Sequence, residues 1–197
     1  MASGIRNRAV TLLLTALLGA APVLAADTLP DAASLVAGLG GRWTGTLSYR
    51  DYSSNAQVQL PMVSEIVALA DGATVISINR FADGPKAGIV TATDVSLFDN
   101  AASSVTSAAF RRGKAVSSET STTQVARYSD RLHWTIIYTH DGSDNGQPAL
   151  IRLTQSRDGN ALTARNEVQP GTTPGVWALR SGSDLTRDGG ETLPSKK

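Results

Sequence analysis

Residues 40–52 read GGRWTGTLSYRDY and bring three aromatic side chains together in a chain that is only 5% aromatic. Their alternation predicts a β-strand over residues 42–51, because successive side chains of a strand point to opposite faces. The face that we expect to point inward carries Trp43, Gly45, Leu47, Tyr49 and Asp51. The stretch therefore predicts the first strand of a sheet with one buried face.

A short helix and nine further strands are predicted around this one. Asp31 can cap the segment AASLVAGL, and Gly40-Gly41 end it. Beyond residue 41 the pattern has period two or consists of β-rich runs between turn residues, including Asp-Gly-Ser at 141–143. The predicted strands are residues 42–51, 57–69, 74–81, 88–98, 103–111, 117–128, 131–140, 149–157, 161–168 and 176–181.

This order of elements predicts an all-β protein. Strands that follow one another without a crossover helix form an antiparallel meander, which must close or fold over because open edges aggregate. We expect an antiparallel up-and-down β-barrel of about 8–10 strands with one short N-terminal helix. No repeat or linker divides the chain, so residues 26–187 are predicted to be a single barrel domain, and residues 188–197 a disordered tail.

The N-terminal residues have the pattern of a signal peptide. Arg6 and Arg8 precede a short apolar run at residues 10–18, and Val-Leu-Ala at 23–25 supplies a cleavage site before Ala26. The apolar run is too short to span a bilayer, which takes about 20 residues. We therefore expect residues 1–25 to be removed, leaving a periplasmic or secreted protein with no integral membrane segment.

Composition excludes several classes of function. The chain has no cysteine, which rules out thiol catalysis, zinc–thiolate sites and a lipoprotein anchor. Of the 18 basic and 17 acidic residues, Arg6 and Arg8 are lost with the signal peptide, so the mature chain has no basic excess. Nucleic-acid binding requires a basic face or stripe, and we expect no nucleic-acid partner.

No motif for catalysis or metal binding is present. The sequence has no Gly-x-Ser-x-Gly elbow, no His-Glu-x-x-His and no phosphate-binding glycine loop. Its two histidines, His133 and His140, are seven residues apart on one predicted strand and so face opposite sides. We expect His133 on the outer face, His140 at a turn or at the barrel mouth, and no metal site.

The segment Leu39-Gly-Gly-Arg-Trp-Thr-Gly after a short helix resembles the start of lipocalin-like (calycin) barrels, whose first strand carries Gly-x-Trp. The resemblance implies that Trp43 plugs the closed end of the barrel and that a late arginine packs across the indole. Arg180 is the arginine expected in that role, a contact that contributes about 0.5–2 kcal/mol. A nitrobindin-like haem barrel also opens with Leu-Gly-x-Trp but needs a histidine near the C-terminus. None follows His140, so no cofactor is expected.

Candidate ligand-binding residues lie on the two best-defined inward faces. Tyr49 and Asp51 come at the far end of the first predicted strand, and His140 ends a later one. Trp134 and Tyr138 share the inward face with His140. These five residues predict a non-catalytic, exported barrel that holds a small, partly apolar or amphipathic molecule with polar groups at the mouth.

Two other functions remain open. In the first, the barrel is a structural or protein-interaction module whose interior is filled by its own large side chains: Trp134, Tyr138, Met62 and Phe81. An interior volume below about 300 Å³ would favour this alternative over ligand binding. In the second, the mouth carries a hydrolase or isomerase site, with candidates Tyr49, Asp51, Arg152 and Glu167. Glu65 interrupts an apolar run, and the pattern fits either an inward or an outward side chain.

Overall fold

The computed structural model describes residues 29–51, 54, 56–83 and 88–189. The predicted signal peptide at 1–25 and residues 190–197 of the predicted tail lie outside the described residues. Asp188, the first residue of that tail, is held against the barrel, since its carboxylate accepts hydrogen bonds from Arg42 and Thr44.

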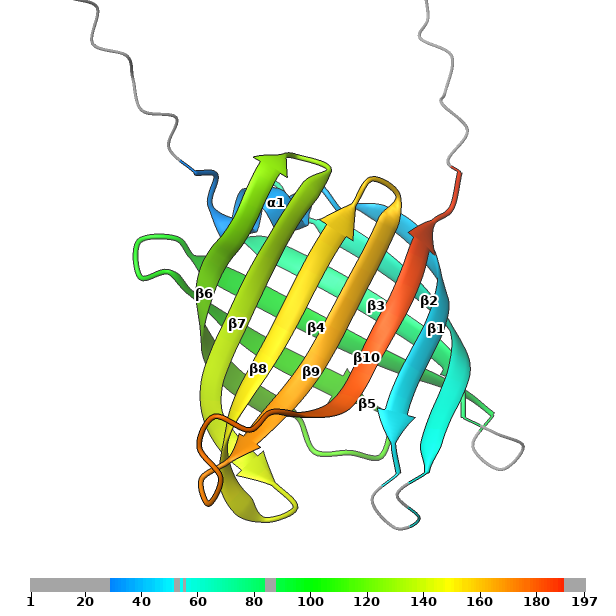
Figure 1. Cartoon of the computed structure of the whole chain (residues 1–197). Coiled ribbons are helices and arrows are strands. Elements are labelled where there is room, and N and C mark those ends of the chain that lie inside the picture. The colour runs from blue at the N-terminus through cyan, green and yellow to red at the C-terminus, as the bar shows by residue number, and fades with distance from the viewer. Residues whose placement is uncertain (1–28, 52–53, 55, 84–87, 190–197) are drawn as a thin grey trace, which may run out of the picture.

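The described chain forms one short helix and ten strands that close into a single antiparallel barrel (Figure 1). Consecutive strands are neighbours throughout, and the last strand pairs with the first. The prediction of an all-β, up-and-down antiparallel barrel with a short N-terminal helix is therefore confirmed. The elements are α1 (Ala32–Ala37), β1 (Gly41–Arg50), β2 (Gln57–Ala68), β3 (Thr74–Ala82), β4 (Ile89–Asp99), β5 (Ser104–Arg111), β6 (Ser117–Asp130), β7 (His133–Asp144), β8 (Gln147–Asp158), β9 (Ala161–Pro170) and β10 (Ala178–Arg187).

Two strands end at least four residues later than predicted. The strand β7 does not turn at residues 141–143 but continues to Asp144, and the turn falls at Asn145 and Gly146. Both turn residues have positive φ, 49° and 76°, which is the backbone of a tight hairpin turn and favours Asn-Gly. Likewise β10 continues beyond residue 181 to Arg187, because its pairing with β1 extends as far as Trp43.

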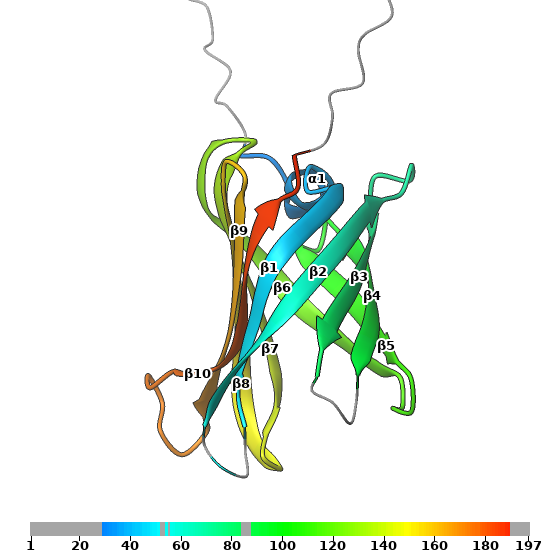
Figure 2. The same cartoon turned by 90° about the vertical axis from the view of Figure 1, so that its right-hand side faces the viewer.

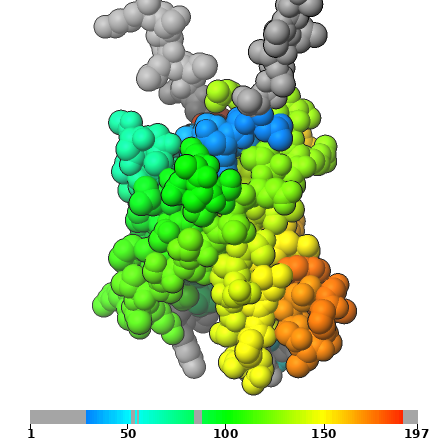
Figure 3. Space-filling model, turned by 90° about the vertical axis from the view of Figure 1, so that its left-hand side faces the viewer, coloured from blue at the N-terminus to red at the C-terminus, as the bar shows by residue number. Residues whose placement is uncertain are grey.

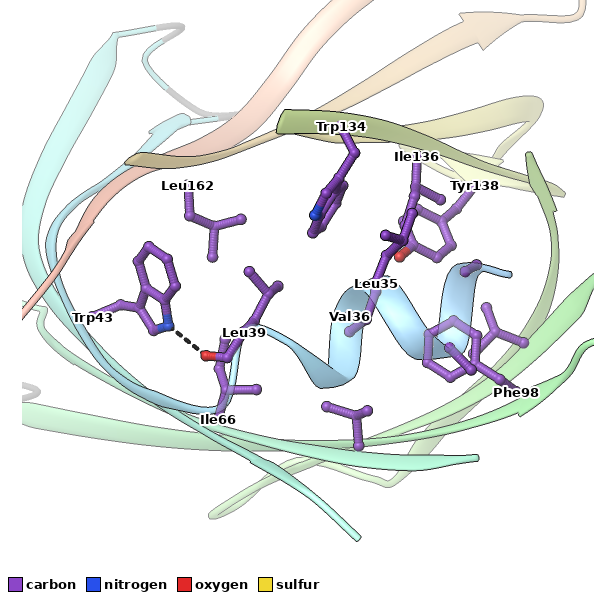
Figure 4. Close-up of a cluster of buried hydrophobic side chains, with 14 of the residues drawn as sticks. Leu35, Val36, Leu39, Trp43, Ile66, Phe98, Trp134, Ile136, Tyr138 and Leu162 are labelled. Carbon is purple, nitrogen blue, oxygen red and sulfur yellow. Dashed lines mark hydrogen bonds between the residues drawn. The ribbon is translucent and has the colours of Figure 1, made fainter. Parts of the chain in front are cut away.

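The helix α1 closes one end of the barrel. Asp31 caps it as predicted, accepting a hydrogen bond of 2.7 Å from the Ser34 backbone N–H. Its apolar residues Leu35 and Val36 enter the barrel and belong to one buried cluster with side chains from strands of both walls (Figure 4). In the space-filling view the helix fills the space between the ends of the strands (Figure 3).

Trp43 is completely buried in this closed end. Its indole Nε1 donates a 2.7 Å hydrogen bond to the backbone carbonyl of Leu39, the second residue after α1 (Figure 4). The bond ties the first strand to the end of the helix. It also pairs a carbonyl that lies beyond the last residue of α1, outside the hydrogen bonds of the helix.

Two arginines bind the neighbouring carbonyls and lie against the same indole. Arg157 of β8 donates to the carbonyl of Gly38 at 2.9 Å, and Arg187 of β10 donates to that of Gly40. Their guanidinium carbons lie 5.8 and 5.4 Å from the Trp43 ring centroid, within the range of a cation–π contact. The closed end is thus held by one tryptophan and two arginines that share three consecutive carbonyls.

The expectation that Arg180 packs on Trp43 is corrected by this arrangement. The β1–β10 register places Arg187 opposite Trp43, whereas Ser181, the neighbour of Arg180, lies opposite Tyr49 near the other end. Arg180 instead forms an ion pair with Asp144, its Nε lying 3.1 Å from each carboxylate oxygen. The position on the indole that was expected for Arg180 is occupied by Arg187, seven residues further along the chain.

The barrel wall opens partly between β2 and β3 (Figure 2). Strand β2 pairs with β1 from Gln57 onward, but pairs with β3 only from Met62, directly after Pro61. Proline has no N–H to give to a ladder and is found at such edges. An apolar groove of about 470 Å³ lies here, lined in part by Met62 and Phe81.

No helix among the described residues is long and apolar enough to cross a membrane.

Candidate functional site

The interior of the barrel holds a cavity of about 560 Å³ that begins at Val36 of α1. It is nearly twice the volume of about 300 Å³ below which a ligand site is not expected. Side chains from every strand contribute to its lining. The polar members are Ser64, Ser77, Asn79, Asp94, Ser96, Ser107, Glu119, Ser121, His140, Gln155, Asn166, Ser181 and Ser183.

The lining changes from apolar to polar with distance from α1. On β4 the inward side chains run from Phe98, beside the helix, through Ser96 to Asp94. Because inward residues are two apart on every strand, this order can be compared between strands. The same sequence of apolar, intermediate and polar residues occurs in Val75–Ser77–Asn79 of β3, Ile136–Tyr138–His140 of β7, Leu162–Ala164–Asn166 of β9 and Leu185–Ser183–Ser181 of β10. Strand β8 runs the other way, with Gln155 opposite Ile136 and Ile151 opposite His140.

Asp94 is a largely buried carboxylate on the polar part of the wall. Its Oδ2 accepts a 3.0 Å hydrogen bond from the Asn79 side-chain amide of β3. Burial raises the pKa of Asp94, the Asn79 hydrogen bond lowers it, and the charge of Glu119 raises it further. No arginine or lysine lines the cavity among the described residues. Asp94 therefore carries an electrostatic cost that no arginine or lysine of the described cavity lining offsets.

His140 links two residues of the adjacent strand β6. Its Nδ1 lies 3.0 Å from Ser121 Oγ, and its Nε2 lies 3.2 Å from Glu119 Oε2. An ionised carboxylate only accepts hydrogen bonds, so the proton of a neutral His140 belongs on Nε2, and Nδ1 accepts from the Ser121 hydroxyl. The serine, the imidazole and one carboxylate oxygen of Glu119 are thus paired with one another.

The remaining polar groups of the interior differ in how well they are paired. Tyr138 donates a 2.9 Å hydrogen bond to Gln155 Oε1, and burial raises the pKa of its hydroxyl. By contrast, Asn166 Oδ1 is buried without any hydrogen-bond partner. Leaving such an acceptor unpaired costs about 1–3 kcal/mol.

The five predicted ligand residues divide into two groups. Tyr138 and His140 line the cavity, as described above. Tyr49, Asp51 and Trp134 do not contribute to its lining. The Tyr49 hydroxyl lies 3.5 Å from Asp83 near the far end of β3, Asp51 accepts a hydrogen bond within the β1–β2 connection, and Trp134 packs beside α1.

The four residues considered for an enzyme at the mouth are not brought together at one site. Arg152 and Glu167 form an ion pair of 2.8 Å, and the Arg152 guanidinium lies 3.9 Å from the Trp177 ring centroid. This group lies on the outer face, because Leu153, the next residue, lines the cavity. Glu65 is also on the outer face, where it pairs with Arg80 at 2.9 Å. The buried Ser64 and Ile66 on either side of Glu65 explain its direction.

Metal ligation finds no support in the described part of the chain, where no group of three or more histidine, aspartate and glutamate side chains is placed to hold an ion. His133 is half-exposed, and its Nδ1 lies 2.8 Å from Asp130. It lies away from His140, whose neighbours are described above.

Sequence reasoning missed Asp94, Glu119 and Asn166. Asp94 could have been found, because it has the same parity as Phe98 and Ser96 on one strand. Glu119 had no such signal, since residues 117–124 of β6 are polar on both faces and carry no apolar alternation. Its inward direction follows from pairing with β5, where Ser107 lies opposite Glu119.

Replacing the Asp94 carboxylate by an amide should stabilise the protein at neutral pH. The raised pKa means that the folded state holds this proton more tightly than the unfolded chain, so stability falls as pH rises from about 4 through the folded pKa. Urea unfolding at pH 3 and pH 7 should show Asp94→Asn close to the native protein at the lower pH and more stable at the higher. A difference that does not change with pH would contradict the assignment.

Asp71 serves as a control, because its contribution to stability should change with pH in the opposite direction. Hydrogen bonds from the Thr74 hydroxyl and from the Thr74 and Ala73 amides lower its pKa. Its contribution to stability is therefore present above the unfolded pKa of about 4 and lost as pH falls. Asp71→Asn should lose stability at pH 7 and converge with the native protein at low pH.

Comparison with known proteins supports the fold but assigns no function. No family model matches the chain, and no curated protein sequence matches it. Among solved structures, the chain is similar to the crystal structure of Rv2717c from M. tuberculosis, with a TM-score of 0.56 and 12% identity. The aligned region covers 82% of this chain and 99% of that one. The protein is thus a closed ten-stranded antiparallel β-barrel that shares its fold with Rv2717c.

Proposed function

We propose that this protein is an exported, non-catalytic barrel that binds a small, partly apolar molecule in its interior. The observation that carries the proposal is the cavity of about 560 Å³, which is within the usual range of about 300–1,000 Å³ for small-molecule sites. Its apolar wall beside α1 and its polar wall further along the strands suit a ligand with one apolar and one polar end.

The large side chains of the interior support this proposal over a self-filled barrel. Trp134, Ile136 and Phe98 pack with α1 at the closed end, so they fill that end only. Phe81 lines the groove between β2 and β3 instead of the central cavity. Met62 and Tyr138 do line the cavity, but serines from several strands lie beside them, and a volume of about 560 Å³ remains open.

We further propose that the chain is a lipocalin-like barrel exported by residues 1–25. Support comes from Gly41-Arg42-Trp43 on the first strand, with a short helix beneath it and arginines across the indole. That arrangement is the one that the resemblance to lipocalin-like barrels implies. Export follows from the charged, apolar and small-residue regions of the N-terminal sequence.

Filling the cavity should abolish binding without unfolding the barrel. Ser183 lines the cavity, and its side chain makes no hydrogen bond among the described residues. Ser183→Phe should lower the affinity for the uncharged fluorophore N-phenyl-1-naphthylamine at least about tenfold, because the added ring occupies the ligand volume and each factor of ten equals about 1.4 kcal/mol. Fluorescence titration measures this affinity.

Thr46→Phe is the matched control. Thr46 pairs with Asp184, next to Ser183, and is exposed on the outer face. The same ring placed there should leave the fluorophore affinity unchanged. Equal effects of the two substitutions, or no binding to the native protein, would argue against an interior ligand.

The hydrogen-bonded group of Ser121, His140 and Glu119 allows a test of the proposal that the protein binds its ligand without catalysis. Its groups are those of a serine hydrolase triad, but here the serine lies on Nδ1 and is only 6% exposed. Incubation with a fluorophosphonate should leave the intact mass of the native protein unchanged. An adduct that disappears in Ser121→Ala would contradict binding without catalysis and favour a hydrolase.

A further inference from the structure

We propose that the ligand is an amphipathic cation, with an apolar body and a protonated amine. This inference rests on the proposed function, since it identifies the class of molecule that the same cavity holds. It is carried by three features of the lining: the sign of its charges, the kind of hydrogen-bonding groups left unpaired, and their position relative to the apolar wall.

The charges of the cavity have one sign. Asp94 and Glu119 contribute carboxylates to the lining, and no arginine or lysine does so among the described residues. Elsewhere on this barrel the pattern is different, because Glu65 and Glu167 on the outer face each pair with an arginine. A buried carboxylate is normally paired with a cation, so the partner of Asp94 is expected to come from outside the protein.

The unpaired groups on this wall are acceptors. Asp94 uses Oδ2 to accept from Asn79, while Oδ1 has no hydrogen-bond partner within the described residues. Glu119, whose side chain is 56% exposed, contacts His140 through Oε2 only. An ammonium group has three donors and no acceptor, whereas a ligand carboxylate has acceptors alone. The vacant positions therefore match an amine and repel an acid.

The apolar wall sets the orientation of the ligand. Phe98, Ile66 and Leu162 line the end of the cavity at α1, and Asp94 lies four residues from Phe98 on the same strand. That separation is about 13 Å along a strand, at about 3.3 Å per residue. An alkyl or aryl amine can place its body against α1 and its ammonium group between the carboxylates at this distance.

The test is isothermal titration calorimetry with three probes that share one ten-carbon chain: decylamine as its cation, decanol and decanoate. We expect decylamine to bind at least about tenfold more tightly than decanol, since a hydrogen bond to a charged group contributes enough for one factor of ten. Decanoate should bind most weakly of the three. Equal affinities, or a preference for decanoate, would overturn the amine assignment while leaving the proposed binding function in place.

Two substitutions test whether Asp94 is the residue that favours the amine. Asp94→Asn should weaken decylamine about tenfold and leave decanol unchanged. Asp158→Asn is the matched control, because it removes the same charge from a side chain that is 88% exposed at the end of β8. If decylamine loses as much affinity in Asp158→Asn, the preference is a general charge effect and the assignment fails. If none of the three probes binds the native protein, the proposed function itself is contradicted.

Discussion

Replacing Trp43 by alanine should lower the unfolding free energy by about 3–5 kcal/mol, the usual cost of removing a buried aromatic side chain. The indole is fully buried, and its loss also strips the Leu39 carbonyl of its hydrogen bond. Arg157 and Arg187 also lose their cation–π contacts with the ring. Because domains of this size have a stability of about 5–15 kcal/mol, urea denaturation should show a large fall in the transition midpoint.

Two further substitutions separate the contributions at this site. Trp43→Phe keeps a ring but removes the N–H, so it should cost about 1–3 kcal/mol for the unpaired Leu39 carbonyl. Trp177→Ala removes a tryptophan that is half-buried against Arg152 and should cost much less than Trp43→Ala. A nearly neutral Trp43→Ala would refute the role of this residue as the anchor of the closed end.

Gly45→Ala should destabilise the barrel by about 3 kcal/mol, the upper end of the usual cost of overpacking. A Cβ atom at Gly45 would lie 2.0 Å from the backbone carbonyl oxygen of Asp184. Neither atom belongs to a flexible side chain, so the strands themselves would have to separate. The contact lies on the β1–β10 seam, where the barrel closes, and the substitution acts on closure as well as on local packing.

The measurement for Gly45→Ala is the unfolding free energy in urea, together with the affinity for the fluorophore used above. We expect both to fall, because separating β1 from β10 alters the wall that carries Ser183. Thr46→Ala is the control: it changes the next residue of the same strand, whose side chain is exposed, and should stay within about 0.5 kcal/mol of the native protein. A Gly45→Ala variant as stable as Thr46→Ala would show that the two strands are not so close.

The predicted elements that proved reliable rest on local rules. The Asp31 cap, the inward face of the first strand and the succession of ten strands depend on side-chain chemistry within a few residues. The turn after β7 was predicted at the wrong residues because two neighbouring segments, Asp-Gly-Ser and Asn-Gly, both have turn chemistry. The pairing of β7 with β8 decided between them, since Asp144 lies opposite Gln147 and leaves only Asn145 and Gly146 in the turn.

The candidate site was harder to predict for a related reason. His140 and Tyr138 were found because apolar alternation on their strand indicates the buried face. Glu119 lies on a strand with little apolar alternation, and its partner His140 is 21 residues away in the sequence. Only the pairing of β6 with β7, which places Thr122 opposite Thr139 and the adjacent Ser121 beside His140, brings the carboxylate and the imidazole together.

By itself, the sequence determined that this chain forms a meander of antiparallel strands after a capped helix, with Trp43 on the inward face, because period and turn chemistry are properties of neighbouring residues. The tertiary structure alone decided which arginines meet that tryptophan, which strand edges close the barrel, and that polar side chains of many strands form one acidic wall beside a cavity. These features depend on the register between strands, and register is set by the closing of the whole barrel.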